Sequence, residues 1–228
     1  MTAAILAEDL LLLTYDPETG RPAADGTRVK CGLAGALVAD LALAGRVRID
    51  KDVLHPADAP APVRDPDLDG LARRISAERR PRKVKWWVQK TATEKLRRAM
   101  LDRAVERGVL VHQKGRVLGV FPSNDYRPAR PAARPELVDR LRGALAGGHN
   151  VDPRFVALLA IAAAMRVDKA LFPDLGARDR RRMVKEAVAR DDIGRAVRTV
   201  IQSIEAATVN AISSGGDGGG GDGGGGGS

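Results

Sequence analysis

The sequence predicts a mainly α-helical single domain wrapped around one apolar central helix, with one or two β-hairpins. Apolar residues recur at helical spacing in most segments, whereas alternating stretches are few and short. The stretch Phe155–Met165 is apolar on nearly all sides, which is typical of a helix in the centre of a fold. Since 44% of the 228 residues are apolar, the chain can bury a sizeable core, and a wholly disordered protein is excluded.

The first quarter of the chain opens with the apolar element Ile5–Tyr15. Gly32–Leu43 carries a helical stripe of apolar residues, and Gly45 suits the end of that helix. Arg46–Ile49 alternates like a short strand. Residues 54–66 contain four prolines, so we expect a surface loop there.

The middle of the chain holds the most clearly marked helix. Leu68–Arg79 predicts a short basic helix that a proline ends. Thr91–Gly108 follows: Thr91 with Glu94 fits a capping box, and Gly108 suits the C-terminal cap. This segment is therefore expected to form one continuous helix.

A hairpin is expected directly after that helix. Val109–Val111 and Val117–Phe121 are apolar and flank Lys114–Arg116. This pattern predicts two short strands with a basic tip between them. Residues 122–135 contain four further prolines and are expected to form an extended loop.

The last part of the chain is helical by pattern and ends in a glycine tail. Helices are expected over 136–145, around the central apolar stretch, and as amphipathic elements over 178–189 and 193–212. Eleven of the last fourteen residues are glycine, so this end has nothing to bury. We therefore expect a folded domain over 1–212 and a flexible, disordered tail over 213–228.

The chain lacks the residue patterns of the common catalytic and metal-binding sites. Cys31 is a single cysteine, which excludes an internal disulfide, and the three histidines stand too far apart for a zinc site. No phosphate-loop, dinucleotide, nucleophile-elbow or zinc-protease motif occurs. Gly32–Gly35 lacks a preceding strand and a phosphate-binding lysine, so we interpret it as close helix packing. The prediction is a protein without enzymatic activity, cofactor or metal.

The length of the apolar stretches also bears on location. The longest uncharged apolar stretch has eleven residues, whereas a membrane-spanning helix needs about 20. The first residues lack the charged and apolar regions of a signal peptide. We expect a cytoplasmic protein whose membrane contact, if any, is peripheral.

Positive charge is concentrated in one segment. The chain has 38 Lys and Arg against 29 Asp and Glu, a formal net charge of +9. Residues 73–107 alone hold 13 basic and 4 acidic residues, so they account for the whole excess. A local basic field of this kind favours phosphate-bearing partners: nucleic acid, an anionic membrane surface or a phosphorylated ligand.

Five stretches, taken together, resemble the Golgi phosphoprotein 3 family, specifically its bacterial members. They are EDLLLLTYDPETGR (8–21), GLAGALVADLALAGRV (32–47), RGVL (107–110), VLGVFPSNDYRPAR (117–130) and DPRFVALLAIAAA (152–164). The bias toward arginine, alanine and glycine is typical of a GC-rich bacterial genome. The resemblance covers about residues 5–212.

The resemblance implies a helical, non-enzymatic peripheral membrane protein that binds phosphatidylinositol 4-phosphate and inserts a hydrophobic hairpin into the bilayer. Eukaryotic members act as adaptors for glycosyltransferases. The family's headgroup pocket uses one tryptophan and three arginines. The matching positions here are Asp25, Ala34, Glu94 and Arg97, so only Arg97 keeps the family's residue. The resemblance therefore implies binding of anionic lipid headgroups with an altered choice of lipid.

Five basic residues are candidate contacts for a phosphate group. Arg28 and Lys30 precede the Gly-Leu-rich helix, and Lys90, Arg97 and Arg98 lie on or just before the capped helix. The arginine fork matches phosphate oxygens. If Lys90 continued the helix, it would share a face with Arg97 two turns later. Solvated faces, with Arg97 paired to Glu94, are the alternative interpretation.

The hairpin residues Lys114, Arg116, Val117 and Leu118 are candidates for contact with a membrane or a second subunit. A basic tip favours anionic headgroups but disfavours deep insertion. The alternative is that the apolar residues of the hairpin belong to the core.

Two other functions stay open. Helix 91–108 followed by a hairpin has the order of a winged helix, which would suit nucleic acid. Trp86 and Trp87 could instead line a groove for a protein client. The leading hypothesis is a peripheral protein on the inner face of the membrane that binds anionic phospholipid through the 73–107 segment.

Overall fold

The computed structural model describes residues 4–58, 65–117, 121–146, 152–189 and 194–214, and within them the fold is mainly helical, as predicted. The helices are α1 (Leu6–Thr14), α2 (Gly26–Leu43), α3 (Pro66–Ser76), α4 (Val84–Thr91), α5 (Glu94–Glu106), α6 (Ala133–Ala146), α7 (Pro153–Ala164), α8 (Asp168–Leu171), α9 (Ala177–Ala189) and α10 (Gly194–Ser214). The strands are β1 (Val47–Asp50), β2 (Val53–Pro56), β3 (Arg82–Lys83), β4 (Leu110–Val117) and β5 (Phe121–Pro128). They form two antiparallel sheets, β1-β2-β3 and β4-β5. The predicted glycine tail falls on residues 215–228, outside the described ones.

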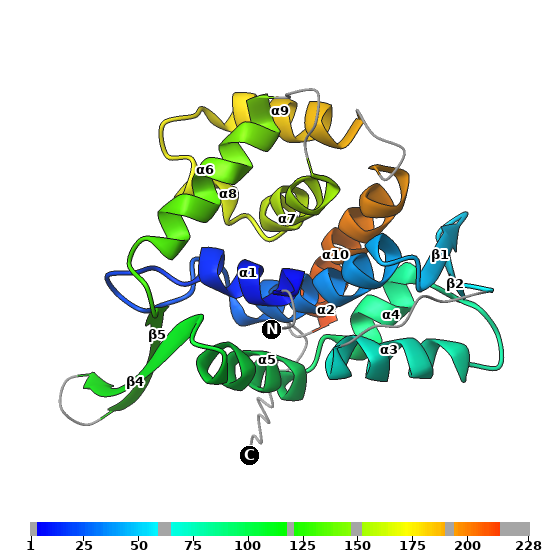
Figure 1. Cartoon of the computed structure of the whole chain (residues 1–228), viewed down its shortest axis with the longest axis horizontal. Helices are drawn as coiled ribbons and strands as arrows, with labels where there is room; N and C mark the ends of the chain where they lie inside the picture. Colours follow the sequence, from blue (N-terminus) through cyan, green and yellow to red (C-terminus); the bar gives the residue numbers. More distant parts are fainter. Residues whose placement is uncertain (1–3, 59–64, 118–120, 147–151, 190–193, 215–228) are drawn as a thin grey trace, which may run out of the picture.

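The central helix is α7, as its uniform apolarity predicts. Val156–Ala162 are all buried, and α1, α6, α9 and α10 surround the helix (Figure 1). Asp152 caps its first turn, because its Oδ1 accepts a hydrogen bond from the Arg154 backbone N–H at 2.9 Å. The helix α2 is buried along most of its length as well, so two apolar helices rather than one form the centre of the fold.

Close helix packing is what Gly32 and Gly35 provide, which confirms the interpretation of that motif. A Cβ atom on Gly35 would lie 2.4 Å from Cδ1 of Ile204 on α10. One on Gly32 would lie 2.0 Å from the Met165 sulfur. The crossing of α2 with α10 therefore depends on the absence of a side chain at Gly35, and the contact of α2 with the end of α7 depends on its absence at Gly32.

Three helices end in the same way. At α2, α5 and α7, the residue after the C-cap has a positive φ: Gly45 (64°), Gly108 (67°) and Arg166 (62°). At each end, the following residue donates a backbone hydrogen bond of 2.8–2.9 Å to the carbonyl five positions earlier. Glycine adopts this conformation freely, whereas an L-residue with a side chain bears a cost of about 1 kcal/mol. Arg166 is thus an unusual residue for its position.

The acidic pair in the opening motif holds the fold together through buried ion pairs. Glu8 is 1% exposed and accepts a hydrogen bond from Arg103 Nε at 2.7 Å. The same guanidinium bridges to Asp65, itself buried, and to Asp67 at 2.7 Å. A single arginine therefore joins α1, the start of α3, and α5.

Asp9 takes part in a second cluster on the other side of α1. Arg154 donates to Asp9 at 2.7 Å and to Asp40 at 3.2 Å. The other oxygen of Asp40 accepts the Leu6 backbone N–H at 2.7 Å. These bonds tie the start of α1 to α2 and α7.

The predicted start of the capped helix is wrong by three residues. Thr91 is the last residue of α4, and α5 begins at Glu94. The chain turns at Ala92, and Thr93 is the residue whose Oγ1 accepts from the Leu96 N–H at 3.1 Å. The sequence Thr-Ala-Thr-Glu offers two threonines, and the bend at Ala92 selects the second one as the cap. Gly108 caps the other end as predicted.

The predicted basic tip of the hairpin is also wrong. The ladder runs from Leu110 opposite Pro128 to Val117 opposite Phe121, so Lys114 pairs with Asn124 in the middle of a strand. Residues 118–120, among them the candidate Leu118, lie outside the described ones. Residues 122–128 are a strand rather than a loop. Their prolines are tolerated because both strands of a two-stranded sheet are edge strands, where a missing N–H need not break a ladder.

Candidate anion-binding site

The positive charge of the basic segment 73–107 is partly neutralised in the folded structure. Acidic residues from outside the segment fold against it: Asp69 pairs with Arg73 at 2.6 Å, and Glu8 pairs with both Arg103 and Arg107. Part of the apparent excess therefore serves the fold. The arginines that remain at the surface decide where an anion can bind.

Arg97 and Arg98 line a recess of about 390 Å³ at the base of the β4–β5 hairpin. Leu101 and Asp102 of the same helix line it too, and side chains from distant segments complete it: Tyr15, Pro22, Asn124 and Tyr126. We call it the α5 recess. Two guanidinium groups, two phenol hydroxyls and one amide can donate hydrogen bonds to an anion there, whereas the Asp102 carboxylate opposes one.

The recess is held in shape by packing between the loop after α1 and the hairpin. The Tyr126 N–H donates to the Gly20 carbonyl at 2.9 Å. A Cβ atom on Gly20 would lie 2.6 Å from Cβ of Asp125, so only glycine allows this approach. Tyr15 packs edge-on against Tyr126 with ring centroids 5.3 Å apart, and His112 stacks parallel to Tyr126 with centroids 4.6 Å apart. The hairpin projects from this point away from the helices (Figure 1).

Glu94 already occupies part of the hydrogen-bonding capacity of the recess. Arg97 donates to the Glu94 carboxylate through Nε at 3.0 and 3.1 Å and through Nη2 at 2.6 Å. Arg98 Nε lies 3.5 Å from the same carboxylate. The hydrogen bonds from Arg97 lower the pKa of Glu94 and, reciprocally, raise the pKa of Arg97. Burial raises the pKa of Tyr15, although Arg97 opposes this, so the phenol stays a donor at neutral pH. An incoming anion competes with Glu94 for Arg97.

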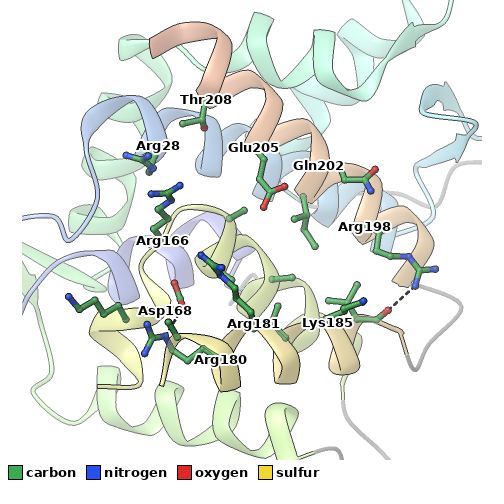
Figure 2. A pocket seen from close by; sticks show the side chains of 18 of the residues that line it. Arg28, Arg166, Asp168, Arg180, Arg181, Lys185, Arg198, Gln202, Glu205 and Thr208 are labelled. Atoms are coloured by element: carbon green, nitrogen blue, oxygen red, sulfur yellow. Dashed lines mark hydrogen bonds and ion pairs between the residues drawn. The ribbon is translucent and has the colours of Figure 1, made fainter. Parts of the chain in front are cut away.

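The other three candidate phosphate contacts do not join Arg97 and Arg98. Lys90 is on α4, a separate helix, and its Nζ lies 5.4 Å from the centroid of Trp86. Lys30 lines a smaller cavity of about 270 Å³ beside α10. Arg28 pairs with Asp25 and lines a third cavity (Figure 2). Of the five candidates, only Arg97 and Arg98 therefore line one recess.

The two positions that depart from the family's headgroup pocket on α2 have structural roles here. Asp25 caps α2, accepting the Arg28 N–H at 3.0 Å. Ala34 is fully buried. An arginine at that position would have to leave the core, so this part of the family's pocket has no equivalent in the present fold.

The hairpin candidates are only partly described. Lys114 is exposed on β4, and Arg116 and Val117 belong to the same strand. Contact of this hairpin with a membrane or a second subunit remains a prediction.

The structure bears on the two alternative functions. The two helices α4 and α5 followed by β4–β5 have the order of a winged helix, but the exposed residues of α5 include Glu94, Asp102 and Glu106 beside its cations. Mixed charge does not favour contact with a phosphate backbone. Trp87 is 2% exposed, whereas Trp86 is partly exposed and lies near Arg82 and Lys90; contact of this pair with a protein client stays a prediction.

No described helix combines the length and apolarity that crossing a membrane requires. In the same residues, no three side chains of the metal-ligating types come together.

Five recess residues were not singled out by the sequence: Tyr15, Pro22, Asp102, Asn124 and Tyr126. A signal was present for Tyr15, Asn124 and Tyr126: they stand in stretches that carry the family resemblance, and the fold brings these stretches together beside Arg97.

The family model described as Golgi phosphoprotein 3 (GPP34) matches residues 6–204. No curated protein is significantly similar to the chain.

Proposed function

Because the chain belongs to the Golgi phosphoprotein 3 family, we propose that it binds the headgroups of anionic phospholipids from the membrane surface without crossing the bilayer. The headgroup lies in the α5 recess. The observation that carries this proposal is the meeting of Arg97 and Arg98 with two tyrosines in one concave, pre-shaped place. Family membership favours binding over catalysis, and the inner face of the membrane is the expected location.

The choice of lipid follows from what the recess offers. Guanidinium and phenol groups bind any phosphate, and Glu94 weakens all such contacts alike. Asp25, Ala34 and Glu94 stand at the family's other contact positions, and none of them lines the recess, so it has little with which to select phosphatidylinositol 4-phosphate. We propose weak selectivity among acidic lipids.

Co-sedimentation with vesicles tests the function. Three compositions are compared: phosphatidylcholine alone, phosphatidylcholine with phosphatidylglycerol, and phosphatidylcholine with phosphatidylinositol 4-phosphate. We expect comparable binding to both acidic vesicles, no binding to the neutral ones, and loss of binding as salt screens the contacts. Strong preference for phosphatidylinositol 4-phosphate would contradict the assigned pocket. Binding to duplex DNA but to none of the vesicles would support the nucleic-acid alternative instead.

A further inference from the structure

The cavity that Arg28 lines is larger than the α5 recess and lies between α7, α9, α10 and the first turn of α2 (Figure 2). Its volume is about 720 Å³, within the range of small-molecule sites. We call it the α9–α10 cavity. It shares no lining residue with the α5 recess.

The floor of the cavity consists of small, apolar side chains of α7. Ala160, Ala163 and Ala164 face the space, and Val184 of α9 and Ile201 of α10 close its sides. Elsewhere on α10, Ile204 packs directly onto Gly35. The alanines of α7 therefore leave a volume that α9 and α10 do not fill.

The walls of the cavity are strongly basic. Seven cationic side chains and two carboxylates line it. One carboxylate, Asp168, is held by Arg180 at 2.8 Å. Among the described residues, Arg166, Arg181 and Lys185 form no ion pair with a carboxylate. Arg166 and Arg181 come from different elements and project into the same half of the cavity (Figure 2).

Arg166 is held there at the expense of backbone strain. It occupies the left-handed position at the end of α7, where α2 and α5 have glycine. The side chain that makes this position unfavourable is one that lines the cavity. Strained residues are often retained where the side chain has a function.

We propose that the α9–α10 cavity binds one amphipathic anion, a molecule with a phosphate or carboxylate head and a single apolar chain. The head lies against Arg166 and Arg181, and the chain lies along the alanine floor toward Lys185. An anion without a chain would leave the floor empty, and a neutral amphiphile would leave the two arginines without a partner. This site is additional to the headgroup site in the α5 recess and does not depend on it.

Isothermal titration calorimetry with short-chain probes below their micellar concentrations tests the proposal. Octyl phosphate and octanoate carry both features, octyl glucoside has the chain alone, and inorganic phosphate has the anion alone. We expect one tight site for octyl phosphate, about tenfold tighter than for octyl glucoside or inorganic phosphate, since charge-assisted contacts and burial of the chain contribute together; the α5 recess, which lacks a place for the chain, should bind it no better than inorganic phosphate. Equal affinity for octyl phosphate and either single-feature probe would overturn the proposal, as would no binding. Comparison with octanoate distinguishes a phosphate from a carboxylate head.

Matched variants place the bound probe. Arg181→Gln should weaken octyl phosphate about tenfold, whereas Arg178→Gln, on the same helix but outside the cavity lining, should leave it unchanged. Arg166→Gly should weaken binding while raising the Tm, because glycine relieves the strained position. A weakened site in a more stable protein cannot result from misfolding.

One further variant separates this proposal from the headgroup site. Arg97→Gln should reduce binding to vesicles and leave octyl phosphate affinity unchanged. Loss of octyl phosphate binding in Arg97→Gln but not in Arg181→Gln would place the probe in the α5 recess and overturn the proposal, while the headgroup function would stand.

Discussion

At the scale of single residues, Glu94 competes with an incoming anion for the arginines of the α5 recess. Its carboxylate takes three hydrogen bonds from Arg97 and lies near Arg98, so both cations are partly neutralised before any ligand arrives. Glu94→Gln should therefore raise binding to phosphatidylglycerol vesicles several-fold. Glu106→Gln, on the same helix but outside the recess lining, makes the same charge change and is the control. If both variants bind equally well, net charge rather than the recess governs the interaction.

Asp40 makes stability depend on pH. Burial raises the pKa of Asp40 to about 7, against the opposing effects of Arg154 and the Leu6 N–H; Asp9 and Asp65 raise it slightly. The folded state holds this proton more tightly than the unfolded chain, so the stabilisation is present at low pH and is lost as pH rises toward 7. Asp40→Asn cannot titrate. Between about pH 5 and about pH 8, its free energy of unfolding should gain about 2 kcal/mol relative to the natural protein.

Urea unfolding at several pH values measures this difference, because other titrations are common to both proteins and cancel. A constant difference across the range would mean that Asp40 is ionised in the folded protein throughout.

At the scale of elements, Arg103 connects three of them through buried carboxylates. Arg103→Met keeps much of the packing but leaves Glu8 and Asp65 buried without their main partner. We expect a loss of about 3 kcal/mol in the free energy of unfolding. Arg98→Met, an exposed position on the same helix, should change it by less than about 1 kcal/mol. Similar losses in thermal unfolding for both variants would contradict a structural role for the Glu8 cluster.

The contact between α2 and α10 gives a paired test with glycines. Gly35→Ala places a methyl group against Ile204, so we expect a loss of about 2 kcal/mol. Gly143→Ala is in the interior of α6 with nothing within 4 Å, so it should gain about 0.5 kcal/mol from helix propensity. Equal effects in denaturant unfolding would mean that the two helices do not meet as closely as described.

At the scale of the whole molecule, local sequence patterns predict the helices and strands better than the contacts between them. The apolarity of Phe155–Met165 and the glycines at 45 and 108 are local signals, and the elements they predict are present. The predicted cap at Thr91 is wrong because a second threonine follows the first and caps the helix instead. The predicted tip at Lys114–Arg116 is wrong because a strand can continue through a sequence that resembles a turn.

The recess could be predicted only in part. Arg97 and Arg98 are adjacent in sequence, whereas Tyr15 and Tyr126 join them through long-range packing that periodicity does not contain. The sequence overestimates the positive charge available on the 73–107 segment for the same reason, since the acidic residues that neutralise part of it come from elsewhere in the chain. Arg166 gives no local signal, because its strain exists only in the folded backbone.

The most direct test of the central claim is the binding of Arg97→Glu to phosphatidylglycerol vesicles, measured beside Arg178→Glu. Both variants lower the net charge equally, but only the first alters the α5 recess. Binding by Arg97→Glu should fall several-fold with helical content unchanged by circular dichroism, while Arg178→Glu binds like the natural protein. Equal binding by the two variants would contradict the assignment of the headgroup to the α5 recess.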